Sequence, residues 1–344
     1  MRNRVFQVVA AGLLTSSLIA SAAIARPRAT APVSKDNRQI TNLAPVAVSG
    51  SLPGPAFWKV EKGGHVMWVL GVTNPLPSKM QWETAAIERA VEHSQAVLKA
   101  PSLEVGARVG FWGQLFLIPS MIGIRKLPNG ETLHDVLSPS LYSRWEAQRT
   151  KYLGGPGGTD RLRPIFAGEK LYEAAIKHSG LTNDGGVQGR VLSLAKHDNV
   201  PVVDTSYVAV MQDPRADAKL FKTVTMSDQQ CLSGILDATE QDLSQATARA
   251  NAWATGDLAA LRTVLATHQQ DECLSAVGNT EFAQKMGMTD IANRIKSAWV
   301  KAAEAALTKN QQTTALLPID KLLAADGYLA ALQASGYVVT APQE

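Results

Sequence analysis

The sequence lacks most of the patterns that indicate a particular chemistry. Its 344 residues include only two cysteines and six histidines. No Cys-x-x-Cys pair is present, which argues against thiol redox catalysis, and no His-x-His or His-x-x-x-His pair offers a compact metal site. The glycine cluster at residues 154–158 lacks the Gly-Lys-Ser/Thr ending of a phosphate loop, so it predicts a surface turn.

The chain also has little excess charge of one sign. Its formal net charge is +4, of which Arg2 and Arg4 contribute two. The remaining basic residues are dispersed and do not alternate with aromatic residues, so we do not expect nucleic acid as a partner. No internal repeat is visible. The apolar fraction is ordinary for a globular protein, and the length is sufficient for a sizeable core.

The N-terminus has the composition of a secretory signal. A basic start precedes an apolar stretch from Val5 to Ala20, and Ala23-Ile24-Ala25 has the small residues of a cleavage site. This stretch is too short for a comfortable membrane span. We therefore expect residues 1–25 to be a signal peptide, and the mature protein to be periplasmic or secreted with no membrane span. Residues 26–53 predict a proline-rich linker, and residues 54–344 the folded domain.

The two cysteines are predicted to form a disulfide. Cys231 and Cys273 each follow a polar triplet, and an oxidising compartment permits them to pair. Such a bond would close a loop of roughly 40 residues and add about 4 kcal/mol in the loop-entropy model. The alternative is a nucleophilic Cys–His pair that uses His268, although its surroundings do not resemble a protease signature.

Hydrophobic patterning predicts an α/β fold with a mixed central β-sheet flanked by helices and a largely helical insertion. One amphipathic helix is expected from Glu83 to Val97, with Ile87 and Val91 on its apolar face. An alanine-rich helical series follows from Gly234 to Ala306, broken at Gly256, Gly278 and Gly287. Strands are predicted at Ala56–Val60, His65–Leu70, Ala96–Leu98, Val200–Val203, Thr313–Leu317 and Tyr337–Thr340.

Several dispersed motifs have the order expected of one known family. Phe57–His65 leads into Val69–Asn74, which gives a short strand, a hairpin and a second strand ending in a glycine turn. Further along, Trp253–Leu258 has the sequence Trp-Ala-Thr-Gly-Asp-Leu, and Ala324–Leu329 precedes Gly336–Val339. Together these motifs resemble the TraB/GumN family over roughly residues 55–341. The resemblance implies the same mixed sheet with a helical insertion.

The resemblance also implies a metal or hydrolytic site, as in the Tiki proteases and the erythromycin-esterase and ChaN-like relatives. That site combines a Gly-x-x-His after the first core strand, an acid after the next strand, and a second Gly-x-x-His near the C-terminus. This chain keeps Gly71 but has Asn74 at the first histidine, Lys99 or Ala100 at the acid, and Lys321 at the second histidine. Asp204 remains acidic where the family usually has Leu-Glu-Thr.

Two more family positions differ in this chain. Gln188 replaces the acid of a Gly-Val-Asp motif, and Asn293-Arg294 reverses an expected Arg-Asn pair. An amide is a poor zinc ligand and cannot transfer protons as a base, and an ammonium repels a divalent ion unless burial removes its proton. We therefore predict neither a bound metal nor a cofactor.

The candidate cleft consists of residues expected at the carboxyl ends of core strands, where α/β sheets commonly bind ligands. These residues are Gly71, Asn74, Lys99, Asp204 and Lys321. The alternative is that Asn74 and Lys321 are an ordinary turn asparagine and an exposed helix lysine.

The sequence therefore predicts a catalytically inactive binding protein of the cell envelope, a pseudoenzyme of a metal-dependent hydrolase family. Its expected partner is a small molecule, an envelope protein or a polysaccharide. The alternative is a metal-dependent hydrolase or protease with a remodelled site. The seven tryptophans are spread along the chain, which favours packing roles over a carbohydrate platform.

Overall fold

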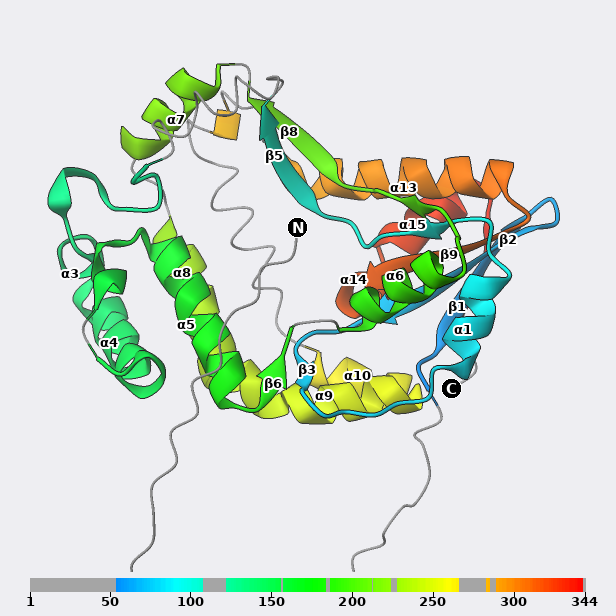
Figure 1. Cartoon of the computed structure of the whole chain (residues 1–344), viewed down its shortest axis with the longest axis horizontal. Coiled ribbons are helices and arrows are strands. Elements are labelled where there is room, and N and C mark those ends of the chain that lie inside the picture. Colours follow the sequence, from blue (N-terminus) through cyan, green and yellow to red (C-terminus); the bar gives the residue numbers. More distant parts are fainter. Residues whose placement is uncertain are drawn as a thin grey trace, which may run out of the picture. The chain divides into compact units, whose positions relative to one another are not determined.

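A six-stranded mixed sheet forms the centre of the fold (Figure 1). The computed structural model describes residues 54–107, 122–155, 157–183, 186–211, 213–223, 228–265, 283–284 and 289–342. The predicted signal peptide and linker, His268 and Cys273 lie outside these residues. The strand order is β10-β1-β2-β9-β4-β7. Strands β2, β9, β4 and β7 run parallel, whereas β1 and β10 are antiparallel to their neighbours.

All six predicted strands are present, with ends that differ by a few residues. The sheet contains β1 (Phe57–Lys62), β2 (His65–Val72), β4 (Val97–Leu98), β7 (Val202–Val203), β9 (Gln312–Pro318) and β10 (Val338–Thr340). Gly63 and Gly64 join β1 to β2 with φ values of 60° and 85°. Glycine adopts this left-handed region at little cost, and a two-residue hairpin turn requires it.

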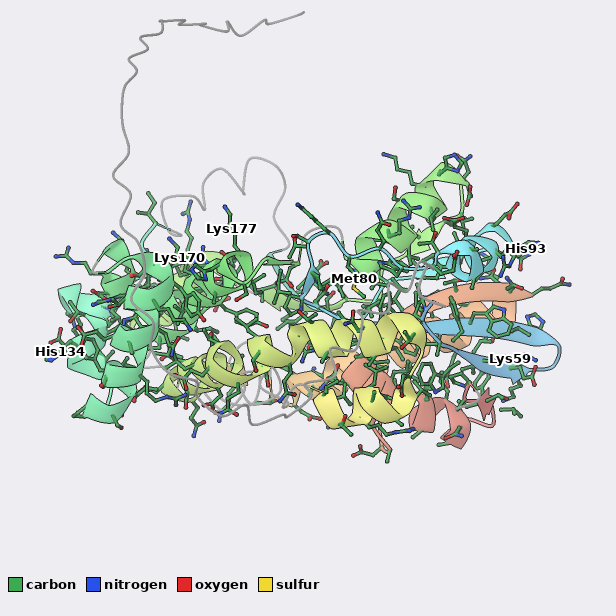
Figure 2. The ribbon with its side chains drawn as sticks, turned by 90° about the horizontal axis from the view of Figure 1, so that it is seen from below. Lys59, Met80, His93, His134, Lys170 and Lys177 are labelled. Atoms are coloured by element: carbon green, nitrogen blue, oxygen red, sulfur yellow. The ribbon has the colours of Figure 1, made fainter. Side chains whose placement is uncertain are left out.

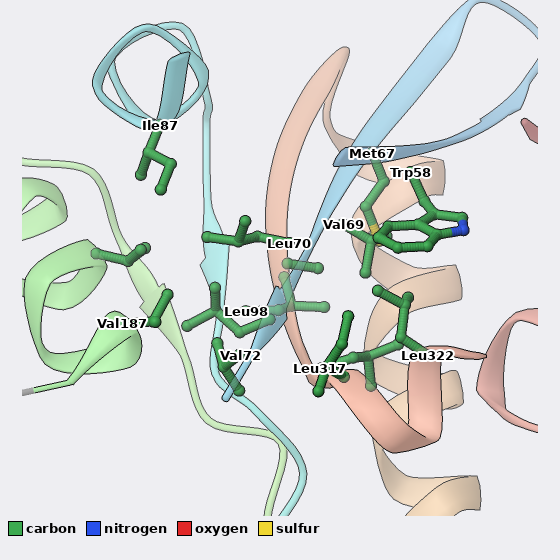
Figure 3. Packing of buried hydrophobic residues seen from close by; sticks show 14 of the residues in the cluster. Trp58, Met67, Val69, Leu70, Val72, Ile87, Leu98, Val187, Leu317 and Leu322 are labelled. Atoms are coloured by element: carbon green, nitrogen blue, oxygen red, sulfur yellow. The ribbon is translucent and has the colours of Figure 1, made fainter. Parts of the chain in front are cut away.

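Helices cover both faces of the sheet. One face carries α1 (Ala85–Glu92) and α6 (Val187–His197), and the other carries α13 (Ile291–Lys309), α14 (Ile319–Leu323) and α15 (Tyr328–Ala334). Figure 3 shows Ile87 and Val187 on one side of the sheet and Leu322 on the other. Because β2 and β9 are largely buried on both faces, their buried residues run consecutively and do not alternate with exposed ones.

The helix predicted to reach Val97 ends at Glu92, which corrects the boundary. The Ser94 hydroxyl donates to Ala90 O (2.7 Å) and lies 2.9 Å from the Thr314 hydroxyl, which binds the chain to β9 directly after the helix. Val97 then pairs with both Val202 and Thr314 as a strand. Long-range strand pairing therefore outweighs the helical periodicity of this segment.

The helical insertion has a hydrophobic core of its own. It contains α3 (Leu133–Val136), α4 (Pro139–Leu153), α5 (Pro164–His178) and α8 (Asp228–Asp237), with short 3₁₀ turns at Pro128–Gly130 and Gly158–Arg161. Trp145 is fully buried at its centre, where its indole donates to Asp160 Oδ1 at 3.2 Å. The buried apolar residues around it are Leu133, Leu137, Leu141, Ala167, Leu171, Leu232 and Leu236.

The helices after α8 connect the insertion to the sheet. A π-helical segment, Ala238–Asp242, leads into α9 (Leu243–Thr255) and α10 (Leu258–Val264). The predicted break at Gly256 is confirmed, because Gly256 ends α9 with φ 71° and Asp257 caps α10 by accepting from Ala260 N at 2.9 Å. The breaks expected at Gly278 and Gly287 lie outside the described residues.

The described part of the chain also contains two small sheets that were not predicted. Strand β5 (Leu103–Ala107) pairs in parallel with β8 (Tyr207–Met211), and β3 (Leu76–Pro77) pairs with β6 (Leu181–Thr182). Helix α7 (Pro214–Thr223) follows β8, and α13 packs against β8 as well as the central sheet (Figure 1). Across the described ranges, no helix combines the length and apolar character needed to cross a bilayer.

Candidate functional site

The carboxyl ends of four parallel strands define one edge of the central sheet. Strands β2, β9, β4 and β7 end there at Val72, Pro318, Leu98 and Val203. The residues that follow these ends include Asn74, Lys321, Lys99 and Asp204, four of the five positions expected in the cleft. Loops at this edge of a parallel sheet are the usual place for ligand-binding groups.

Lys99 and Asp204 form an ion pair across the ends of β4 and β7, the last two strands of the sheet. Lys99 Nζ lies 2.8 Å from Asp204 Oδ2, and the other carboxylate oxygen accepts from the Ser206 backbone N–H (2.9 Å) and hydroxyl (2.5 Å). The hydrogen bond from Lys99, followed by those from Ser206, lowers the pKa of Asp204 to about 2. The carboxylate in turn raises the pKa of Lys99. Both oxygens of Asp204 therefore accept hydrogen bonds, and its pKa lies far below the neutral range that suits a general base.

The backbone beneath this ion pair is held by three side chains. Lys99 O accepts from the Thr205 hydroxyl (3.0 Å) and from the buried indole of Trp299 (3.2 Å). Gln188 at the start of α6 accepts from Ala100 N at 3.0 Å. The amide that replaces the expected acid therefore supports the strand end. These contacts fix the position of Lys99 relative to Asp204.

Gly71 has a packing role and does not line a cavity. Its carbonyl accepts a 2.7 Å hydrogen bond from the Trp253 indole, and the residue is buried. A Cβ atom at Gly71 would collide with Ile319 and come within 3.2 Å of Leu322 Cδ2. The absence of a side chain lets α14 pack directly on β2.

Asn74 lies on the α6 side of the edge. It is exposed, and a Cβ atom built on Gly186 would lie only 2.6 Å from Asn74 Oδ1. Gly186 precedes α6 and lines a cavity of about 500 Å³ together with Trp82 and Arg190. Asn74 is thus placed against the residue that precedes α6.

Lys321 lines a second cavity, of about 470 Å³, between α13, α14 and the segment after β4. Its Nζ lies 3.3 Å from Asp320 Oδ2, and its side chain is only 23% exposed. Gly327 lets the turn after α14 approach closely, because a Cβ atom there would be 2.6 Å from Lys321 O. The five predicted residues are therefore not gathered in one cleft. Lys99 and Asp204 form an ion pair, Lys321 lines a cavity, Gly71 has a packing role, and Asn74 lies against Gly186.

The donors at this edge do not fit a divalent metal. Its one predicted carboxylate, Asp204, is already neutralised by an ammonium, and the histidine positions hold an amide and a second ammonium. Within the described part of the chain, no three His, Cys, Asp or Glu side chains gather into a set that could hold a metal. Figure 2 shows His93 and His134 far apart, on α1 and α3.

The sequence did not identify several supporting residues. Thr205 and Trp299 act through long-range contacts that no local pattern reveals. Ser206 had a usable signal, because an aspartate followed two residues later by serine is typical of a turn in which the carboxylate accepts the serine N–H. Cys231 is buried on α8, and its predicted partner Cys273 lies outside the described residues, so their pairing stays a prediction.

The helical insertion contains a buried charged group that the sequence also did not identify. Arg163 and Asp228 are 2% and 5% exposed. Burial raises the pKa of Asp228 to about 6 and lowers the pKa of Arg163, while their charges favour each other. Arg163 also donates to Phe221 O at 2.5 Å and stacks over the Phe221 ring. We interpret this group as structural because it joins α5, α7 and α8.

The fold and the strand edge define an α/β protein with a mixed sheet, a helical insertion and ligand-sized cavities at the carboxyl ends of its parallel strands. The chain belongs to the TraB/PrgY/gumN family, whose model matches residues 56–341. This match confirms the family resemblance in the sequence. No match was found among curated proteins or among solved structures.

Proposed function

We propose that this member of the TraB/PrgY/gumN family is a binding protein and has no hydrolytic activity. The ion pair between Lys99 and Asp204 carries this proposal. In hydrolysis by a general base or by a bound metal, the carboxylate must accept a proton near neutral pH or bind the metal. Asp204, with its pKa lowered to about 2 and both oxygens engaged, is suited to neither task.

The proposed ligand is a small polar or anionic molecule at the same strand edge. Lys321 and Lys296 both line the cavity beside α14, where their ammonium groups favour negative charge. Helices α13 and α14, which contribute these residues, pack against β2 and β9 of the central sheet, and this packing fixes their position. A partner protein or polysaccharide that presents an acidic group would use the same chemistry.

The proposal includes export to the cell envelope. Its support is the sequence of residues 1–25, with basic residues, an apolar stretch and an Ala-x-Ala cleavage site. The predicted disulfide between Cys231 and Cys273 agrees with an oxidising compartment. Fractionation of cells that produce the full chain should recover a protein starting at Arg26 in the periplasm or medium. Recovery of uncleaved chain in the cytoplasm would contradict export.

Hydrolysis assays test the absence of catalysis. Wild type, Asp204→Ala and the control Asp198→Ala should all show no turnover of peptide and ester substrates above the rate without protein. Asp198 is a suitable control because it is an aspartate in the turn before β7. Reproducible turnover by wild type and Asp198→Ala that disappears in Asp204→Ala would overturn the proposal and establish the hydrolase alternative.

A further inference from the structure

The cavity beside Lys321 is lined by both apolar and polar residues. Its apolar residues include Pro101, Leu103, Ile295, Pro318 and Ala324. Its polar groups are Ser102, Asn293, Lys296, Lys321 and Asp326. The volume of about 470 Å³ falls within the range of small-molecule sites. A ligand that fills this cavity must therefore meet apolar side chains as well as polar groups.

The charged groups of the lining are two lysines and one aspartate. Lys296 comes from α13 and Lys321 from α14, and Asp326 is the carboxylate among them, whereas Lys321 Nζ also lies 3.3 Å from Asp320 Oδ2. Lys296 Nζ donates to the backbone carbonyl of Asp326 at 3.5 Å. A carbonyl is neutral, so this bond does not cancel the positive charge of the ammonium. An ammonium has three donors, so Lys296 can keep this bond and also bind an anion.

We propose that this cavity binds a small amphipathic anion, with one carboxylate or similar head group at Lys296 and Lys321 and an apolar chain along Leu103, Ile295 and Pro318. This inference rests on the proposed binding function and specifies its ligand class. A charge-assisted hydrogen bond fixes the head group, and burial of the chain supplies most of the affinity.

Two other ligand classes fit the cavity less well. A sugar would need an accessible aromatic face, but Tyr328 is 6% exposed and its ring packs edge-on against Trp299 at 5.5 Å. A polyanion such as a nucleotide would bring several negative charges next to the Asp326 carboxylate, with only two lysines to offset them. A ligand with a single anionic head group brings less negative charge next to Asp326.

Calorimetric titration of the mature protein with decanoate tests this proposal. Decanoate should bind saturably, whereas 1-decanol, which lacks the charge, and acetate, which lacks the chain, should bind at least 10-fold more weakly. Lys296→Met and Lys321→Met should each weaken decanoate binding about 5- to 10-fold, because each removes a cation but keeps an unbranched side chain. Ala292→Trp, at the exposed rim, should block entry.

The matched control is Lys301→Met, which removes an exposed lysine of the same helix that does not line this cavity. Its decanoate affinity should equal that of wild type. Thermal unfolding of each variant shows whether it is folded. No saturable binding of decanoate to wild type, or equal affinities in wild type, Lys296→Met and Lys321→Met, would overturn the proposal.

A second measurement shows whether a negative binding result contradicts only the ligand class or also the proposed non-catalytic function. The same preparations are assayed for hydrolysis of p-nitrophenyl decanoate. No binding of decanoate and no turnover would overturn only the amphipathic-anion proposal. Turnover that disappears in Asp204→Ala would overturn the non-catalytic function, and with it the ligand assignment that rests on that function.

Discussion

The edge of the sheet lowers the pKa of an aspartate, whereas the interior of the insertion raises it. At the edge, Asp204 is about half exposed and receives hydrogen bonds from Lys99 and Ser206, so its pKa falls to about 2. In the insertion, Asp228 is 5% exposed, and loss of solvation raises its pKa to about 6 despite the nearby Arg163. Pairing decides the first case and desolvation the second. A perturbed pKa therefore marks a functional site only when its cause and its location agree.

The largest expected difference between the two regions comes from the predicted disulfide, because Cys231 lies in α8 of the insertion. If Cys231 and Cys273 are bonded, reduction should destabilise the protein by about 4 kcal/mol. Hydrogen exchange should increase first in α5 and α8 and last in the central strands. Thiol labelling of denatured protein should find no free sulfhydryl before reductant is added. Two labelled thiols in protein from intact periplasm would contradict the disulfide.

Removing the buried arginine should have the next largest effect. Arg163→Met leaves Asp228 without a compensating charge, so we expect a loss of about 3 kcal/mol at pH 7 by denaturant unfolding. Arg125→Met, which breaks an exposed pair with Glu169 on α5, is the control and should change stability by less than about 0.5 kcal/mol. Equal losses of unfolding free energy in the two variants would show that the burial of Arg163 adds nothing to its contribution.

Asp228 also predicts the sign of a pH effect. Its pKa rises from 3.8 to about 6 on folding, so the folded state binds the proton more tightly. The stability that this proton contributes is present below pH 4 and is lost as pH rises through 6. The loss in Arg163→Met should therefore be smaller at pH 5 than at pH 7. Denaturant unfolding at both pH values measures this difference, and a larger loss at pH 5 would contradict the assignment.

Substitution of a buried glycine by alanine should give a smaller difference in stability between the two regions. Gly71→Ala in β2 would press on Ile319 of α14, and we expect a loss of about 2 kcal/mol. Gly168→Ala in α5 would press on Ile235 at 2.7 Å, but alanine also favours the helix by roughly 1 kcal/mol, which offsets part of the strain. Thermal unfolding should rank Gly71→Ala as the less stable variant. The reverse order would contradict the close packing of α14 on β2.

The exposed ion pair should contribute least to stability. The lowered pKa of Asp204 means that its ionised form stabilises the protein above pH 4, and that this contribution is lost as pH falls through about 2. Solvent screens a pair this exposed, so Asp204→Asn should cost less than about 1 kcal/mol at pH 7. A loss comparable to that of Arg163→Met would show that the pair has a structural role.

The sequence predicted the central sheet better than its surroundings. Strand β2 is almost entirely apolar and β9 ends in the apolar run Ala315–Leu317, because helices cover both faces, so these sequences identify the strands. Strands β5 and β8 were missed, since they pair only with each other and expose Val105 and Val208. The early end of α1 also escaped prediction because it depends on β4 pairing with distant strands.

The candidate site could be predicted by position but not by contact. Spacing relative to the family motifs placed Lys99, Asp204 and Lys321 after strands that end at one edge. It could not show that Lys99 would bind Asp204, or that Lys321 would line a separate cavity with Lys296. These relations depend on how α13 and α14 pack against the sheet, which is set by contacts between segments far apart in the chain.

Metal content tests the central claim most directly, because Lys99 is proposed to occupy the Asp204 carboxylate that a metal site would need. Mature protein is equilibrated separately with zinc, manganese, iron or cobalt, desalted, and measured by elemental analysis beside Asp204→Ala. We expect far less than one ion per chain, equal in both proteins. About one ion per wild-type chain that is lost in Asp204→Ala would contradict the account and favour a metal-dependent hydrolase.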